Sequence, residues 1–194
     1  MLQFLLEPNG KYSLSETAQM AIEGGCEWIQ IHCPEMSDAD LRSEAAELIP
    51  LCRETATILM LEDRPELARE LGLHGIHLRR HDIAPALVRE DMGPEAIIGV
   101  EIASLQGALA LNGLDIDYAA VSPSLDAEAR HSLIASIREA GVELPLVAEG
   151  SFSIEAAKAE VRQFGASGVC TSHHIVDSAD PVEYTSRMIS ALEN

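Results

Sequence analysis

The sequence has few aromatic residues and few basic ones. Only 4% of its 194 residues are aromatic, and 13 lysines and arginines stand against 32 aspartates and glutamates, a formal net charge of -19. A field of this sign repels phosphate and so opposes binding to nucleic acid or to an anionic membrane. The lack of aromatic side chains also argues against a stacking surface for single-stranded nucleic acid. The composition therefore favours a small-molecule ligand.

The sequence also lacks cysteine pairs and long apolar runs. Its four cysteines form no Cys-x-x-Cys motif, which excludes a recognisable disulfide framework or zinc knuckle. No stretch of about 18 apolar residues could span a bilayer. The first residues, Met1 to Glu7, lack the basic flank and apolar run of a signal peptide. We expect a cytoplasmic protein that folds as one domain over residues 1–194, with its oligomeric state left open.

What the sequence does contain is a repeated pattern of a short apolar run followed by an amphipathic segment. Strands that alternate with helices indicate parallel βαβ units. Several runs are apolar at nearly every position, which is typical of strands covered on both faces. The expected strands are residues 2–6, 28–32, 57–61, 75–78, 97–100, 118–121, 144–148 and 168–171. Eight units of about 24 residues predict an α/β fold, a single (β/α)8 TIM barrel of minimal size.

An open, doubly wound sheet is the alternative architecture. Such a fold predicts a glycine-rich phosphate-binding turn after an early strand. Neither G-x-G-x-x-G nor G-x-x-x-x-G-K occurs anywhere in the chain. The pattern therefore favours the barrel.

Functional side chains of a barrel lie at the C-terminal ends of its strands and on the loops that follow. The candidates at these ends are Gln30, His32, Cys33, Glu35, Glu62, Asp63, Arg64, Arg79, Arg80, His81, Asp82, Glu101, Ser122, Glu149, Gly150, Ser151, Ser172, His173 and His174. We expect His174 to be structural and His77, within a strand, to be packed. Arg79 and Arg80 form a cation pair near the mouth that either replaces a lost lysine or pairs with acids such as Asp82.

Several of these segments resemble thiamine phosphate synthase and its TenI relatives in order and spacing. They include Gly24-Gly25 before Gln30, Glu62-Asp63-Arg64, Gly75-Ile76-His77-Leu78 with Asp82, and Gly165-Ala166-x-Gly168-Val169. The resemblance implies a barrel that joins hydroxymethylpyrimidine diphosphate to thiazole phosphate and releases pyrophosphate. It also implies Gln30 on the pyrimidine side and Mg²⁺ held by Asp63 and Asp82, whose hard oxygens suit that ion.

The sequence departs from the family's pattern at the positions where the family binds phosphate groups. The family's Gln-Leu-Arg-x-Lys reads Gln30-Ile31-His32-Cys33-Pro34, and its Gly-x-Ser-x-His reads Gly99-Val100-Glu101-Ile102-Ala103. The loop that holds the diphosphate after the sixth strand is missing, since Ser122-Pro123 leads directly into the helical segment 126–140. Glu149-Gly150-Ser151 puts a carboxylate where the family's glycine pair accepts a phosphate, and Glu149 opposes that field.

These departures leave three hypotheses about function. The first is a thiamine phosphate synthase that still works with relaxed residues, although the departures predict weak or no activity; it assigns no catalytic residue. The family's substrate-binding positions are then Gln30, Glu62, Glu101, Gly150, Ser151 and Ser172. The second is a non-catalytic barrel that binds a thiamine precursor or a protein partner. The third is a repurposed enzyme whose acidic mouth binds a divalent metal. The plainer interpretation is that these positions became acidic without a function, in line with the acidic composition of the whole chain. The mouth would consist of Glu62, Asp63, Asp82, Glu101 and Glu149, with His32 and His173.

Overall fold

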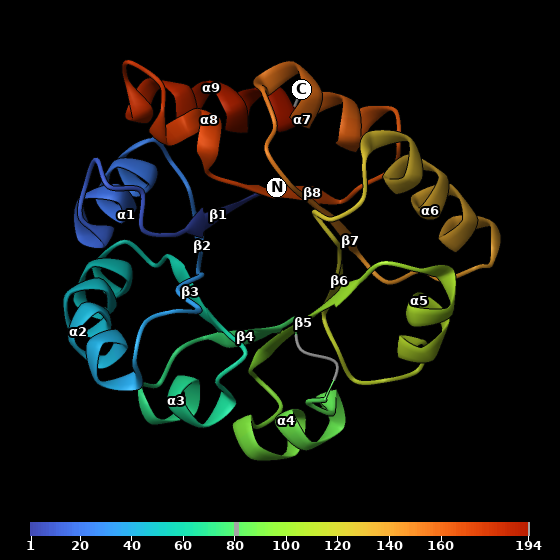
Figure 1. Ribbon diagram of the computed structural model, residues 1–194, viewed down its shortest axis with the longest axis horizontal. Coiled ribbons are helices and arrows are strands. Elements are labelled where there is room, and N and C mark those ends of the chain that lie inside the picture. Colours follow the sequence, from blue (N-terminus) through green and yellow to red (C-terminus); the bar gives the residue numbers. More distant parts are fainter. Residues whose placement is uncertain (80–81, 194) are drawn as a thin grey trace.

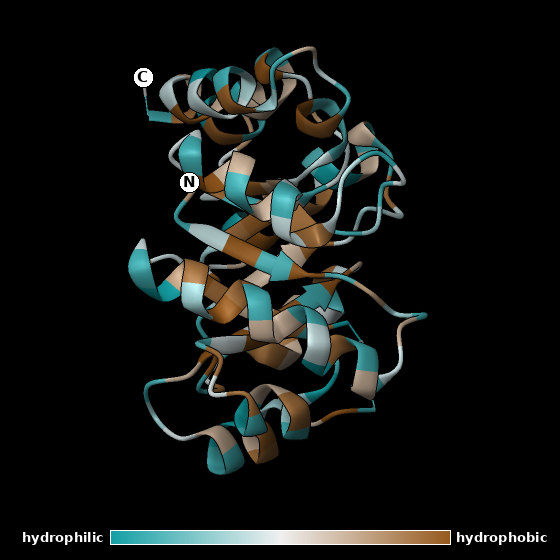
Figure 2. Ribbon diagram, turned by 90° about the vertical axis from the view of Figure 1, so that its left-hand side faces the viewer, coloured by the Kyte–Doolittle hydropathy of each residue, from teal (hydrophilic) through white to brown (hydrophobic). Residues whose placement is uncertain are grey.

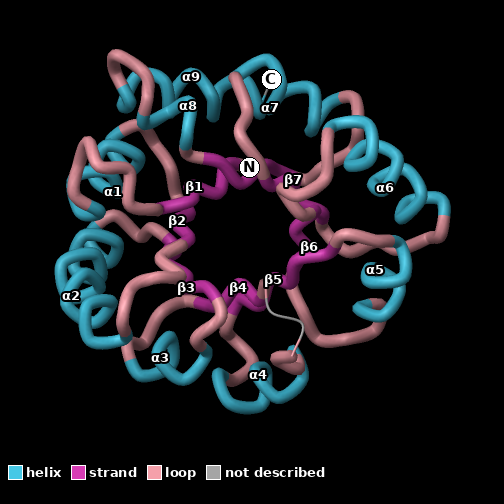
Figure 3. Tube along the Cα trace, in the orientation of Figure 1, coloured by secondary structure: helices cyan, strands magenta, loops and turns pink. Residues whose placement is uncertain are grey.

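The computed structural model describes residues 1–79 and 82–193 and shows a closed barrel of parallel strands ringed by helices (Figures 1 and 3). The strands pair in chain order, and β1 closes the barrel by pairing with β8. They are β1 (Leu2–Leu6), β2 (Trp28–Ile31), β3 (Ile58–Glu62), β4 (Gly75–Leu78), β5 (Ile97–Ile102), β6 (Tyr118–Val121), β7 (Leu146–Glu149) and β8 (Gly168–Thr171). The prediction of a (β/α)8 TIM barrel is confirmed.

Helices lie outside the strands and cover their outer face (Figure 1). They are α1 (Leu14–Glu23), α2 (Asp38–Glu54), α3 (Pro65–Glu70), α4 (Pro85–Met92), α5 (Leu105–Leu111), α6 (Ala127–Glu139), α7 (Ile154–Arg162), α8 (His173–Val176) and α9 (Pro181–Glu193). Local chemistry sets their starts. Ser13 and Glu16 form a capping box on α1, and Asp126 caps α6.

The strand boundaries differ from the predicted ones in ways that move candidate residues. β5 continues to Ile102 because Glu101 and Ile102 still pair with Ala120 and Val121, so Glu101 lies within a strand and not after it. β7 begins only at Leu146, after Pro145, which has no N–H to donate to the sheet. His173 and His174 belong to the short helix α8 and are exposed, and only His173 lines the mouth cavity, so His174 is not part of it.

Alternate residues of each strand point into the barrel, and this period of two builds its interior. Part of the barrel interior is an apolar cluster of Met60, Tyr118, Ala120, Val147 and Cys170. A larger apolar layer lies between the strands and the helices. Figure 2 shows brown, hydrophobic segments along the strands and mixed colours on the helices. Buried polar side chains, among them Gln3, Gln30 and His77, occupy other positions of the strands.

Gly99 shows how tightly the interior is packed. A Cβ built at this position would lie 2.1 Å from Cζ and 2.4 Å from the hydroxyl oxygen of Tyr118. A Gly99→Ala variant should therefore lose about 1–3 kcal/mol of its free energy of unfolding in urea denaturation, because the buried ring has to move. Gly107→Ala is the matched control: its Cβ would lie 3.4 Å from the Ser104 hydroxyl oxygen, an ordinary contact, and alanine favours helix α5. Equal stability of the two variants would contradict the close packing of Tyr118 against Gly99.

Within residues 1–79 and 82–193, no helix has the length and apolar character needed to cross a membrane.

Candidate functional site

Arg79 is the centre of the polar group at the C-terminal end of the barrel. It follows β4, and its guanidinium reaches glutamates on three other strands. One terminal nitrogen donates to Oε2 of Glu101 at 2.5 Å. The other donates to Oε1 of Glu62 at 2.8 Å and to Oε1 of Glu149 at 2.5 Å. One interpretation of the sequence expected Arg79 to pair with acids such as Asp82. Arg79 does pair with acids, and they are three glutamates of the mouth. Arg80 and His81 lie outside the described residues.

Glu62 is the most heavily bonded of the three glutamates. Its Oε2 binds Nδ1 of His32, and its Oε1 accepts from the Gln30 side chain at 2.8 Å. Burial alone would raise the pKa of Glu62, but hydrogen bonds from His32 and Arg79 outweigh burial and hold this pKa at about 2. The same bond to Glu62 raises the pKa of His32. The pair is thus favoured in its charged form.

Glu149 has the opposite electrostatic character. Its side chain is 3% exposed, and burial raises its pKa although Arg79 acts against that rise. Its second oxygen, Oε2, is buried and has no hydrogen-bond partner among the described residues. Both carboxylate oxygens of Glu62 therefore have hydrogen-bond partners, whereas only one oxygen of Glu149 has a partner among the described residues.

A second polar group lies directly below, inside the barrel. The hydroxyl of Tyr118 accepts from the Gln3 side chain at 2.9 Å and lies 3.1 Å from Nδ1 of His77. It also donates to Oε1 of Gln30 at 3.4 Å, which links this group to Glu62. Burial lowers the pKa of His77 to about 4, so its imidazole is neutral near pH 7. His77 is packed, as expected, but within a polar network.

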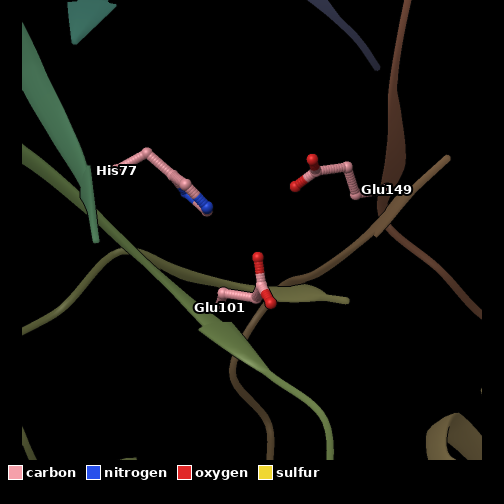
Figure 4. A group of neighbouring side chains, drawn as sticks. All are labelled: His77, Glu101 and Glu149. Atoms are coloured by element: carbon pink, nitrogen blue, oxygen red, sulfur yellow. The ribbon is translucent and has the colours of Figure 1, made fainter. Parts of the chain in front are cut away.

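Three side chains of the two groups converge on one point. The ligand atoms of His77, Glu101 and Glu149 all lie within 4.8 Å of one another. Figure 4 shows the imidazole nitrogen of His77 and both carboxylates directed toward this point from three strands. Nε2 of His77 is buried without a partner in the described part of the chain. This convergence joins two glutamates that the sequence had placed at separate strand ends with a histidine expected to be packed within a strand.

A cavity of about 350 Å³ opens at the mouth beside Arg79 and Glu149. Its lining includes His32, Arg79 and Glu149 together with three residues predicted to bind substrate, Gly150, Ser151 and Ser172. His173 also lines it, as expected for a residue of the mouth. Two groups on its wall already have partners. The Gly150 N–H donates to the carbonyl of Cys170 at 3.1 Å, and the Ser172 hydroxyl donates to Glu7 at 3.0 Å.

Asp63 and Asp82, the predicted metal ligands, line a different cavity beside the mouth. Glu66 and Asp91 line it as well, so its polar groups are oxygen donors of the kind that Mg²⁺ prefers. Asp63 adopts a left-handed backbone conformation, with φ of 51°, and its Oδ1 accepts from the Arg79 N–H at 2.7 Å. The structure thus brings the two aspartates to one cavity, whose acidic side chains are of the chemical type that Mg²⁺ prefers.

Sequence reasoning missed two members of the polar network, Gln3 and Tyr118. Both lie inside strands, where we expected only packing. The signal that could have found Gln3 is its polar side chain at an inward position of an otherwise apolar strand. Tyr118 carried no such signal, because a tyrosine at the start of a strand also fits a packed core.

The family model and the curated relatives point to one family. A family model described as thiamine monophosphate synthase matches residues 5–175. The thiamine-phosphate synthase of Bacteroides fragilis (strain ATCC 25285) is 33% identical over 97% of this chain and 98% of its own length. That of Azorhizobium caulinodans is 31% identical over 93% of this chain and 88% of its own. In fold, the chain resembles a thiamine phosphate pyrophosphorylase from Pyrococcus furiosus, with a TM-score of 0.83, 24% identity and coverage of 99% and 95%.

Proposed function

The chain belongs to the thiamine monophosphate synthase family, and from that membership we propose that its mouth binds a small ligand of thiamine biosynthesis while synthase turnover is weak or absent. The observation that carries this proposal is the engagement of Arg79. Both terminal nitrogens of this cation already donate to carboxylates. A diphosphate entering the mouth cavity would therefore face the carboxylates of Glu149 and Glu7, while the terminal nitrogens of Arg79 already have partners.

Charge then limits the ligand class. Three glutamates face one arginine, and among the described residues His32 is the only further partner of Glu62 that can carry positive charge. A neutral or cationic heterocycle suits this surface, whereas a doubly charged phosphate ester is repelled. The Gly150 amide, bonded to Cys170, adds no free donor. The proposed ligand is thus an unphosphorylated thiamine precursor or product.

Mg²⁺ is part of this proposal only at the second cavity. Asp63 and Asp82 would hold the ion, which neutralises phosphate oxygens when it is bound. No side chain of the described mouth is assigned as a catalytic acid or base. Cys33 is no nucleophile at neutral pH, because burial raises the pKa of its thiol to about 11.

The synthase reaction tests the first half of the proposal. Purified protein is supplied with hydroxymethylpyrimidine diphosphate, thiazole phosphate and Mg²⁺, and released pyrophosphate is measured beside the Bacteroides fragilis relative. The rate should fall at least about 10³-fold below that of the relative, because each lost electrostatic donor is worth about 10²–10³ in rate and several are lost together. A rate within about tenfold of the relative would refute weak turnover.

Ligand binding tests the second half. Unphosphorylated hydroxymethylpyrimidine and thiamine should raise the melting temperature of the protein, while the pyrimidine diphosphate should not. Ser151→Trp places a bulky side chain on the cavity wall and should abolish the shift. Glu35→Gln, which lies outside this cavity, is the matched control and should retain it. Stabilisation by the diphosphate alone would contradict the proposed charge selectivity.

A further inference from the structure

We propose that His77, Glu101 and Glu149 form a binding site for one first-row transition-metal dication inside the barrel. This site is separate from the cavity of Asp63 and Asp82, and the proposal is independent of which organic ligand the mouth accepts. The three side chains come from β4, β5 and β7, so the strands of the barrel itself set their spacing.

The geometry suits such an ion after a small adjustment. The candidate ligand atoms lie within 4.8 Å of one another. Bonds of about 2.0–2.1 Å in a tetrahedral arrangement place ligand atoms about 3.3 Å apart. The ligand atoms would therefore have to approach one another by about 1.5 Å at most, and both carboxylates already point toward the imidazole (Figure 4).

Two of the three ligands carry buried atoms that need a partner. Nε2 of His77 and Oε2 of Glu149 have no hydrogen-bond partner within residues 1–79 and 82–193. His77 is completely buried and Glu149 is 2% exposed. Buried polar atoms are nearly always paired, and an unpaired one is costly. A metal ion at the point of convergence would satisfy both atoms at once.

The other nitrogen of His77 is held as metal-binding histidines usually are. Its Nδ1 lies 3.1 Å from the Tyr118 hydroxyl, which Gln3 fixes from the opposite side. A proton on Nδ1 leaves the lone pair of Nε2 directed at Glu101 and Glu149. Such outer hydrogen bonds fix both the tautomer and the ring orientation of a ligating histidine.

Arg79 leaves room for the ion. It uses Oε2 of Glu101 and Oε1 of Glu149, so each carboxylate retains its other oxygen for a metal. Glu62, Glu101 and Glu149 still outnumber Arg79 and protonated His32, so the surroundings of the site keep a net negative charge that attracts a dication. One imidazole with two carboxylates favours Zn²⁺, Fe²⁺, Co²⁺ or Mn²⁺ over Mg²⁺ and Ca²⁺.

The site would retain an open coordination position. Three protein ligands are fewer than any of these ions takes, and Glu149 also lines the mouth cavity. Water or a ligand in that cavity could therefore complete the coordination. This is the arrangement of a reactive metal site, whereas purely structural zinc sites are closed by four protein ligands.

Metal titration tests the proposal directly. Protein treated with a chelator and then dialysed is titrated with Zn²⁺ by calorimetry and with Co²⁺ by visible absorption. We expect one ion per chain and d–d absorption bands from bound Co²⁺. Glu101→Gln and Glu149→Gln should each weaken Zn²⁺ binding at least about tenfold. The double variant Asp63→Asn/Asp82→Asn should bind Zn²⁺ as the unmodified protein does.

Three outcomes would overturn the site. They are the absence of binding up to about 1 mM Zn²⁺, equal affinity in the glutamate variants and the unmodified protein, or loss of binding in the Asp63→Asn/Asp82→Asn variant alone. In the first case, His77 and Glu149 share a proton or a water molecule instead. Circular dichroism of Glu101→Gln, whose side chain is partly exposed, confirms that the tested variant is folded. The thermal-shift measurement without metal reports on the organic ligand separately.

Discussion

An Arg79→Met variant should lose about 3–5 kcal/mol of its free energy of unfolding, because removing one partner of a buried ion pair leaves the other charge uncompensated. Here the guanidinium serves Glu62, Glu101 and Glu149 together, and their side chains are only 7%, 14% and 3% exposed. Methionine keeps most of the length of arginine but none of its charge. A domain is stable by only about 5–15 kcal/mol in total. Urea denaturation at pH 7 with a chelator present measures the loss.

Arg42→Met is the matched control for this experiment. Arg42 also makes two short hydrogen bonds to a glutamate, Glu70, but both side chains are largely exposed. Its replacement should change the free energy of unfolding far less than that of Arg79. Adding Glu149→Gln to Arg79→Met should recover part of the loss, since one unpaired charge is removed. If Arg79→Met is as stable as the unmodified protein, Arg79 does not hold the three carboxylates.

The strands were predictable because each is a short, mostly apolar run followed by an amphipathic segment. β1, β4, β6 and β8 begin and end where the sequence predicted. The predicted boundaries are wrong where a residue at the end of an apolar run determines whether the strand continues. Pro145 cannot donate to the sheet, which shortens β7, and Glu101 is polar yet continues β5 because its backbone still pairs. Hydrophobicity locates a parallel strand, but backbone pairing sets its end.

The residues of the site were predictable individually, but their contacts were not. Gln30, Glu62, Glu101 and Glu149 were expected near the mouth, and the period of two along a strand does turn each of them inward. What the sequence could not supply is how far an arginine side chain reaches. Arg79 crosses the barrel to glutamates that are distant in the chain, so no local pattern reports the pairing.

Acid titration separates the roles of the glutamates, because their environments act in opposite directions. Partners lower the pKa of Glu62, whereas burial raises that of Glu149. The lowered pKa of Glu62 stabilises the fold at pH values above the pKa that this side chain has in the unfolded chain. This contribution disappears as the pH falls through the pKa of Glu62 in the folded protein. The raised pKa of His32 stabilises the fold below the unfolded value of 6.5 and loses effect as the pH rises through the folded one.

A Glu62→Gln variant should therefore be less stable than the unmodified protein by about 3 kcal/mol between pH 4.5 and 6.5, since a fall in pKa from 4.5 to about 2 corresponds to that energy. The difference should shrink toward zero as the pH approaches 2, because protonated Glu62 then resembles glutamine. It should also narrow above pH 6.5 as His32 loses its proton. Urea denaturation from pH 2.5 to 8 measures the curve, and Glu70→Gln, at an exposed pair, should show no such maximum. A constant difference across this range would mean that Glu62 contributes by packing and not through its charge.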